Sequence, residues 1–163
     1  MNSNGSQHFG VQSSAPVCLI ADDSVVIAKG LGRCAESRGW QPCLVHNGQD
    51  ALRALTERAV VGLAWDAVFL DDQMPILSGH EAILQFRQWE AQHRTHPQHL
   101  KQANVFFITG SGPDGGPTSG AQAGQTMAAP KGFEGVVDGV FIKPLSMTQM
   151  AGFLDSLAAA RRR

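Results

Sequence analysis

The sequence lacks the features that would direct a chain to nucleic acid, a membrane or secretion. Its 13 basic and 14 acidic residues give a formal net charge of −1, so it has no basic field for nucleic acid. No apolar stretch approaches the roughly 20 residues of a membrane span, because the longest candidate, residues 59–70, contains Gly62 and Asp66. The first 16 residues lack the basic start and apolar centre of a signal peptide. We therefore expect a cytoplasmic protein.

Cysteine is also scarce. Cys18, Cys34 and Cys43 are an odd number without C-x-x-C spacing, and we interpret them as reduced core residues. The length of 163 residues suits one domain. We expect a disordered tail or linker over residues 1–15, a folded domain over 16–160 and a basic tail over 161–163.

Five short apolar runs alternate with helical patterns. Strands are expected at 17–21, 42–46, 67–70, 105–108 and 140–142, and helices at about 25–38, 49–58 and 81–93 and after Ser146. In the first helix, we expect Val26, Ile27, Leu31 and Cys34 to face the core. Five βα repeats predict a doubly wound parallel sheet with helices on both faces.

Polar residues end four of these strands. Asp22 and Asp23 end the first, Asp71 the third, Thr109 the fourth and Lys143 the fifth, and parallel strands place their carboxyl ends on one edge of a sheet. Three clustered carboxylates favour a divalent cation, and oxygen ligands favour Mg²⁺ or Mn²⁺ over zinc. An aspartate beside such a metal can become an acyl phosphate, with a hydroxyl and a lysine binding the phosphoryl oxygens.

These residues resemble a known family. Asp22-Asp23 and the runs DAVFLDDQMPILSG (66–79), VFFITG (105–110) and FIKPL (141–145) are similar to the receiver domain of bacterial two-component response regulators, over about residues 17–159. The resemblance implies a flavodoxin-like five-stranded sheet. It also implies a phosphoryl group received from a sensor histidine kinase or histidine phosphotransfer protein, output through contact with a downstream protein, and a possible homodimer.

By position, the resemblance makes Asp71 the phosphoacceptor, because Met-Pro follows it by three and four residues. Asp22 and Asp23 would bind Mg²⁺ together with Asp71 and the backbone carbonyl of Gln73. Thr109 would be the switch hydroxyl, and Lys143, in a cis bond to Pro144, the phosphate-binding lysine. Asp72 competes for the acceptor role, but we expect its side chain to point away from the cluster.

The chain departs from the family in two places. Val140 stands where many receivers have an aromatic switch residue, and Phe141 is expected on the opposite face of the strand. Residues 111–132 contain six glycines and three prolines, so we expect an irregular or displaced fourth helix. This segment is either a remodelled output surface that orders on phosphorylation or a tolerated insertion.

Other functions remain as alternatives. A phosphohydrolase of the haloacid dehalogenase type also uses Asp, Thr or Ser, Lys and Mg²⁺, but it carries D-x-D on the first strand, where this chain has adjacent aspartates. A receiver-like scaffold that does not cycle phosphate would usually have lost an acid or the lysine. Two other groups are better explained without a site, His93, His96 and His99 as a solvated loop and Trp40, Trp65 and Trp89 as packing residues.

Overall fold

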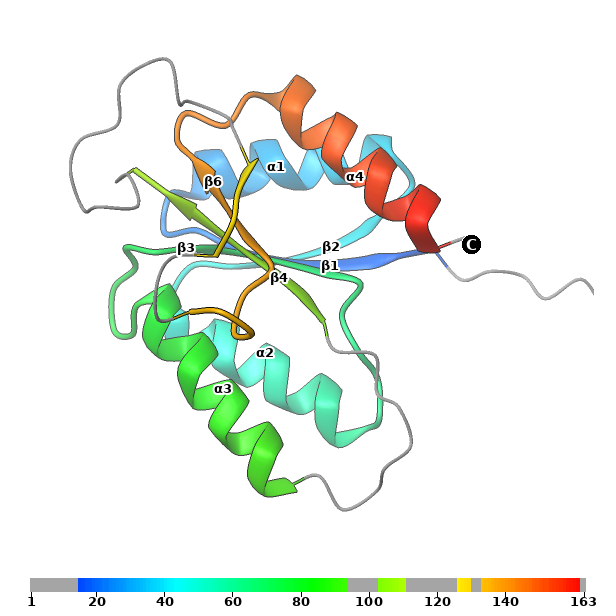
Figure 1. Cartoon of the computed structure of the whole chain (residues 1–163). Helices are drawn as coiled ribbons and strands as arrows, with labels where there is room; N and C mark the ends of the chain where they lie inside the picture. Colours follow the sequence, from blue (N-terminus) through cyan, green and yellow to red (C-terminus); the bar gives the residue numbers. More distant parts are fainter. Residues whose placement is uncertain (1–14, 94–102, 111–125, 130–132, 162–163) are drawn as a thin grey trace, which may run out of the picture.

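The chain folds into one central sheet between two pairs of helices, as a computed structural model describes it for residues 15–93, 103–110, 126–129 and 133–161 (Figure 1). The strands are β1 (Val17–Ala21), β2 (Gln41–Val45), β3 (Ala67–Asp71), β4 (Asn104–Thr109), β5 (Thr126–Met127) and β6 (Gly139–Ile142). The helices are α1 (Val25–Ser37), α2 (Gly48–Val60), α3 (Gly79–His93) and α4 (Met147–Arg161).

The strand order is β2-β1-β3-β4-β6-β5, and all neighbours are parallel except β5 and β6. The five parallel strands therefore have the flavodoxin-like order, which confirms the predicted fold class. The two-residue strand β5 was not predicted, since so short a segment carries no periodic signal. In the connection between β4 and β6, the residues described (126–129 and 133–138) contain no helix; the remainder of the predicted irregular segment lies outside the described residues.

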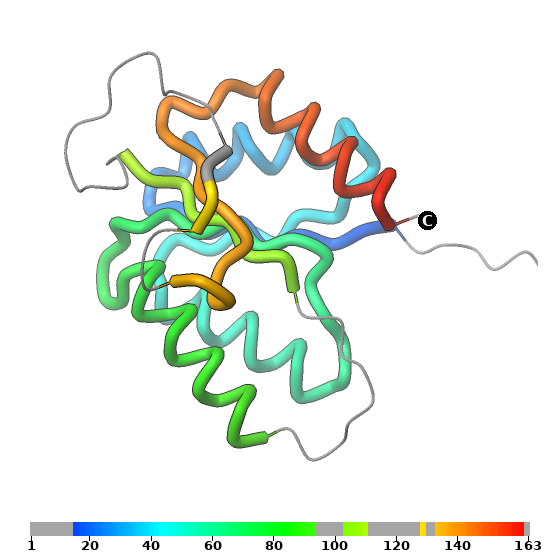
Figure 2. The backbone as a smooth tube through the Cα atoms, viewed as in Figure 1, coloured from blue at the N-terminus to red at the C-terminus, as the bar shows by residue number. Residues whose placement is uncertain are grey.

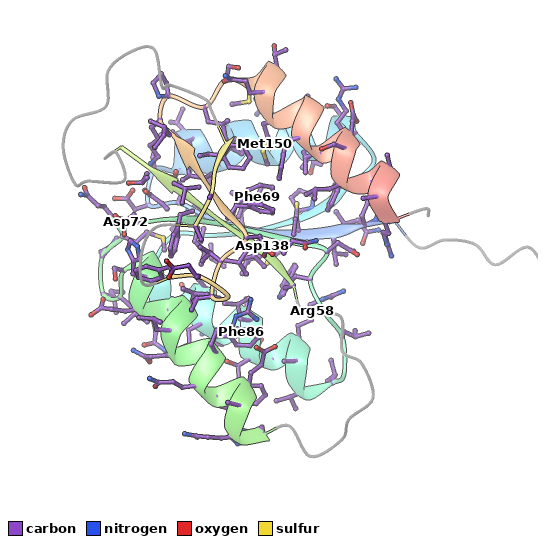
Figure 3. The ribbon with its side chains drawn as sticks, in the orientation of Figure 1. Arg58, Phe69, Asp72, Phe86, Asp138 and Met150 are labelled. Carbon is purple, nitrogen blue, oxygen red and sulfur yellow. The ribbon has the colours of Figure 1, made fainter. Side chains whose placement is uncertain are left out.

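Each face of the sheet has its own core. Because side chains alternate along a strand, Val68 and Leu70 of β3 join the cluster under α2 and α3, whereas Phe69 joins the one under α1 and α4. Figure 3 shows Phe69 and Met150 on one side of the sheet and Phe86 on the other. β3 is buried along its whole length, as expected for a central strand covered on both faces.

The first turn of α1 does not face the core. The expectation for Val26 and Ile27 is wrong, because their exposed fractions are 81% and 40%. The buried residues are Leu31, as expected, and the small residues Ala28, Gly32 and Ala35, which allow the helix to lie close to the sheet. Apolar character alone did not identify this face, since the two exposed residues are more hydrophobic than the small ones that pack.

Several other expectations also need correction. Cys34 and Cys43 are only partly buried, although all three cysteines are free. Arg161, which was expected in the basic tail, is the last residue of α4 and forms an ion pair with Asp66; residues 162 and 163 lie outside the described residues.

The buried cysteine Cys18 gives a prediction about thiol reactivity. Burial, with smaller contributions from Cys43 and Asp66, raises its pKa to about 12. Burial also raises the pKa values of Cys34 and Cys43, but these residues are partly exposed. Because the thiolate is the reactive form, Cys18 should resist an aromatic disulfide reagent in the native protein at mildly alkaline pH.

The measurement is a time course of thiol release, with peptide mapping of the modified sites. Cys34 and Cys43 should react first, and Cys18 only when guanidinium chloride unfolds the chain. Equal native reaction rates for all three thiols would contradict this burial.

Candidate phosphoryl-transfer site

The carboxyl ends of the parallel strands bring the predicted site residues together. Asp71 and Thr109 are the last residues of β3 and β4, while Asp22 and Lys143 directly follow β1 and β6. The register pairs Asp71 with Ile108 and Thr109 with Ile142, so these ends are level with one another. The chain segments are distant in sequence, and the sheet alone makes them neighbours.

Three carboxylates form the centre of the site. One oxygen from each of Asp22, Asp23 and Asp71 lies within 4.8 Å of the others. The exposed fraction is 0% for Asp22 and 5% for Asp71, whereas Asp23 is exposed. Oxygen-only donors with one face open to solvent suit Mg²⁺ or Mn²⁺, which retain water ligands.

Lys143 bridges two of these acids. Its Nζ lies 3.0 Å from Oδ2 of Asp71 and 3.4 Å from Oδ2 of Asp22. Three carboxylates against one ammonium leave an excess of two negative charges, which one divalent cation would balance. The donor set therefore fits a single Mg²⁺ in both chemistry and charge.

The pKa values reflect this crowding. Burial raises the pKa of Asp71, Lys143 opposes the rise, and the nearby charge of Asp22 adds to it. Burial alone would lower the pKa of Lys143, but its hydrogen bond and charge interactions with Asp71 and Asp22 outweigh burial and raise it. The charged form of Lys143 is therefore stabilised, whereas the charged form of the buried Asp71 is disfavoured, and a bound cation would relieve this cost.

Backbone groups fix Asp22 in place. Its Oδ1 accepts a hydrogen bond from the N–H of Ser24 at 2.9 Å, and its own N–H donates to the carbonyl of Val45 at 3.1 Å. Nδ1 of His46 lies 3.0 Å from the Asp22 carbonyl oxygen. Ser24 is also the N-cap of α1. The same residue therefore fixes both the start of the helix and the position of Asp22. His46 was missed in the sequence because no motif marks it.

Two glycines let the loop between β3 and α3 approach its neighbours. A Cβ at Gly79 would lie 2.2 Å from the carbonyl oxygen of Asp71, and one at Gly48 would lie 2.0 Å from that of Leu77. No side chain fits at either distance. The Gly48 N–H also donates to the Leu77 carbonyl at 3.0 Å. The loop that follows Asp71 thus makes close contacts with the first residues of both α2 and α3.

The other residues singled out in the sequence have clear positions. Asp72 turns away from the carboxylate cluster and contacts Nδ1 of His80. The Lys143-Pro144 bond is cis, and Val140 and Phe141 pack on opposite faces of the sheet, as expected. The backbone N–H of Gln73 donates to Oδ1 of Asp71 at 3.4 Å, while metal binding by its carbonyl remains a prediction.

The remaining candidates do not form a second site among the described residues. Trp40 and Trp65 are buried, and Trp89 stacks on Phe86 and His93 at ring distances of 6.2 and 4.5 Å. These tryptophans are packing residues, as predicted. His96 and His99 lie outside the described residues.

Comparisons with known proteins agree with this geometry. No family model matches the chain. Over 101 residues it is 30% identical to hybrid signal transduction histidine kinase I of Dictyostelium discoideum, a match that covers 59% of this chain and 6% of that protein. The chain thus spans a small fraction of this curated relative.

Solved structures share the whole fold. A CheY-like receiver domain from Methylobacillus flagellatus is 24% identical, with a TM-score of 0.62 over 88% of this chain and 99% of that one. A second match is the co-crystal structure of the Saccharomyces cerevisiae histidine phosphotransfer protein Ypd1 with the receiver domain of its downstream response regulator Ssk1. There the identity is 23% and the TM-score 0.66, over 91% of this chain and 92% of that one.

The fold thus defines a flavodoxin-like α/β protein with a cluster of acidic residues at the carboxyl ends of its strands. More specifically, it is the fold of response regulator receiver domains, which confirms the resemblance seen in the sequence. In the part of the chain that the structure describes, no helix is long and apolar enough to cross a membrane.

The tight loop gives a prediction for Gly79→Ala. The added methyl group would overlap the Asp71 carbonyl oxygen, 2.2 Å from the ideal Cβ position. We expect a loss of about 1–3 kcal/mol in the free energy of unfolding, the usual cost of overpacking, measured by urea denaturation.

Gly152→Ala is the matched control. Gly152 is exposed in α4, and nothing lies within 4 Å of a Cβ there, so alanine should stabilise the helix by up to about 1 kcal/mol. If Gly79→Ala proved as stable as Gly152→Ala, the close approach of the loop would be wrong.

Proposed function

We propose that this chain is a phosphoacceptor signalling switch in which Asp71 receives a phosphoryl group from a phosphohistidine. The observation that carries the proposal is the position of Lys143, whose Nζ contacts both Asp71 and Asp22 within a buried carboxylate cluster. An ammonium group beside carboxylates that can hold Mg²⁺ suits the binding of an anionic phosphoryl group. The receiver-domain fold of the chain supports the same role.

The proposed reaction is a displacement at phosphorus. A carboxylate oxygen of Asp71 forms the new O–P bond while the N–P bond to the donor histidine breaks, and the bonding electrons return to the imidazole. Mg²⁺, held by Asp22, Asp23, Asp71 and the Gln73 carbonyl, would compensate the charge of the phosphoryl oxygens. Lys143 would bind one of these oxygens and the hydroxyl of Thr109 another.

The proposed role is that of a switch rather than an enzyme with external turnover. At most, the chain would catalyse its own phosphorylation and dephosphorylation. A phosphohydrolase of the haloacid dehalogenase type is disfavoured because the D-x-D of its first strand is absent. A scaffold that does not cycle phosphate is disfavoured because the acids and the lysine are all in place.

The surroundings of the site fit a protein as donor. Val26 and Ile27 lie in the first turn of α1 close after Asp23, and Met147 follows Lys143 by four residues. All three are exposed, as is Ile76 in the loop after Asp71. Exposed apolar side chains beside a charged pocket are typical of a docking surface. The proposed partner is a sensor histidine kinase or histidine phosphotransfer protein, like the one named in the Ypd1 co-crystal structure.

The first prediction from this function concerns the acceptor. Acetyl phosphate with Mg²⁺ should add one phosphoryl group to the wild-type chain, and chelation of the metal should prevent it. Asp71→Asn should abolish the labelling because it removes the nucleophilic oxygen. Intact-protein mass spectrometry gives the stoichiometry.

Asp72→Asn is the matched control, because that carboxylate is adjacent in sequence but points away from the cluster; it should remain labelled. If Asp71→Asn were still labelled, another residue would be the phosphoacceptor. Continuous turnover of a small phosphomonoester would favour the phosphohydrolase.

The second prediction concerns the donor surface. Val26→Asp places a charge on an exposed apolar position, and it should slow transfer from a phosphorylated histidine phosphotransfer protein at least about tenfold, the effect of 1.4 kcal/mol. Labelling by acetyl phosphate should be unchanged, because that donor needs no docking surface.

Val61→Asp is the control for the second prediction. Val61 is similarly exposed but follows the end of α2, away from the site, so its transfer rate should match that of the wild type. Equal rates for the two variants would exclude the first turn of α1 as the docking surface.

A further inference from the structure

His80 connects three separate segments around the phosphoryl-transfer site. It lies in the first turn of α3, and its Nδ1 contacts Oδ1 of Asp72. Its ring centroid is 4.2 Å from that of Phe107 in β4 and 4.5 Å from that of Phe133, in the connection that leads into β6. The two phenylalanine rings are 5.7 Å apart, edge to face. These four residues are called the His80 stack below.

The polar side of this stack is joined to the acceptor loop. Asp72 directly follows Asp71; its N–H donates to the Ile108 carbonyl at 3.4 Å, and its carbonyl accepts from Gly79 at 3.2 Å. Oδ1 of Asp72 contacts Nδ1 of His80. His80 therefore contacts the residue that directly follows the proposed phosphoacceptor.

The apolar side of the stack reaches the other parts of the site. Phe107 precedes Thr109 by two residues, which places both side chains on the same face of β4. Phe133 begins the segment that ends in β6 and Lys143. The guanidinium of Arg87 holds this segment on α3 through the Val136 carbonyl, at 3.3 and 3.4 Å. Figure 2 shows the residues before β6 beside the N-terminal half of α3.

The strand β6 does not provide an aromatic ring on this face. Val140 faces the same core cluster as Phe107 and Phe133, while Phe141 packs on the opposite side of the sheet. Among the described residues, the aromatic contact between β4 and the connection into β6 is thus made by Phe133, with His80 stacked on both phenylalanines.

From these contacts we propose that the His80 stack couples phosphorylation of Asp71 to the position of residues 133–138. The inference rests on the proposed function and concerns regulation of the same site. A phosphoryl group at Asp71 displaces neighbouring atoms, and both Asp72 and the Phe107–Thr109 segment adjoin it. Packed interiors leave little free space, so a shift at either end of the stack displaces Phe133. The residues after Phe133 then form a surface whose position reports the state of Asp71.

Coupling of this kind is reciprocal. If phosphorylation shifts residues 133–138, then loosening those residues must change the affinity of the pocket for a phosphoryl group by the same factor. Beryllofluoride with Mg²⁺ serves as the phosphoryl mimic, and ¹H–¹⁵N NMR of the whole chain reports both regions. In the wild type, titration should shift the amides of Gly110 and Lys143 and also those of residues 134–138.

Phe133→Leu and His80→Phe test the two halves of the stack. The leucine removes the aromatic contact, whereas the phenylalanine keeps the ring and removes the contact with Asp72. In both variants the pocket amides should still respond, but the shifts over 134–138 should fall by at least half. The affinity for beryllofluoride should change by about fivefold or more, the lower end of typical allosteric coupling. Asp72→Ala, which removes the side-chain oxygen that contacts His80, should behave like His80→Phe.

Phe86→Leu is the matched control. Phe86 is a buried aromatic residue of α3 in the same core cluster, but it stacks on Trp89 rather than on His80. On beryllofluoride titration, the amide shift changes of residues 134–138 in Phe86→Leu should equal those of the wild type. Full shifts over 134–138 in both Phe133→Leu and His80→Phe would overturn the coupling, as would a wild-type chain in which only the pocket amides respond. If the wild-type pocket did not respond, the proposed function would fail, and the coupling with it.

Discussion

The contact of one ammonium group with two buried carboxylates is the interaction on which the site depends. Lys143 lies within ion-pair distance of Asp71 and Asp22, yet it neutralises only part of the charge gathered at this edge of the sheet. An excess of negative charge in a mostly buried cluster is unfavourable without a counterion. The donor set of this cluster therefore suits a divalent cation. Under the proposed function, a cation held there would compensate the charge of an incoming phosphoryl group.

The parallel sheet is what makes this concentration of charge possible. Four of the parallel strands, β1, β3, β4 and β6, contribute the polar site residues at their carboxyl ends. Hydrophobic packing on both faces fixes the register that brings these ends level. Small residues allow the close approaches that remain, most clearly Gly79 against the Asp71 carbonyl and Gly48 against the Leu77 carbonyl. The stability provided by the two apolar cores thus offsets the free-energy cost of clustering a few like charges at one edge of the sheet.

The sequence predicted the parts of the structure that follow from topology. The strand runs and the polar residues at their ends identified Asp22, Asp71, Thr109 and Lys143 as neighbours, because every parallel strand ends on the same edge. Side-chain exposure in the first turn of α1 was predicted wrongly for Val26 and Ile27. Hydrophobicity does not reveal which face of a short turn meets the sheet when the true contact is made by alanine and glycine.

The contacts of His80 show a second limit of sequence analysis. No motif marks this residue, and its partners Asp72, Phe107 and Phe133 come from three segments that only the folded chain assembles. The sequence showed that position 140 is valine and not an aromatic residue, but it did not show that Phe133 packs on Phe107 and His80. In this chain the connection before β6, and not β6 itself, provides the aromatic ring that packs on Phe107. The acidic cluster and the packing behind it are therefore specified by separate residues.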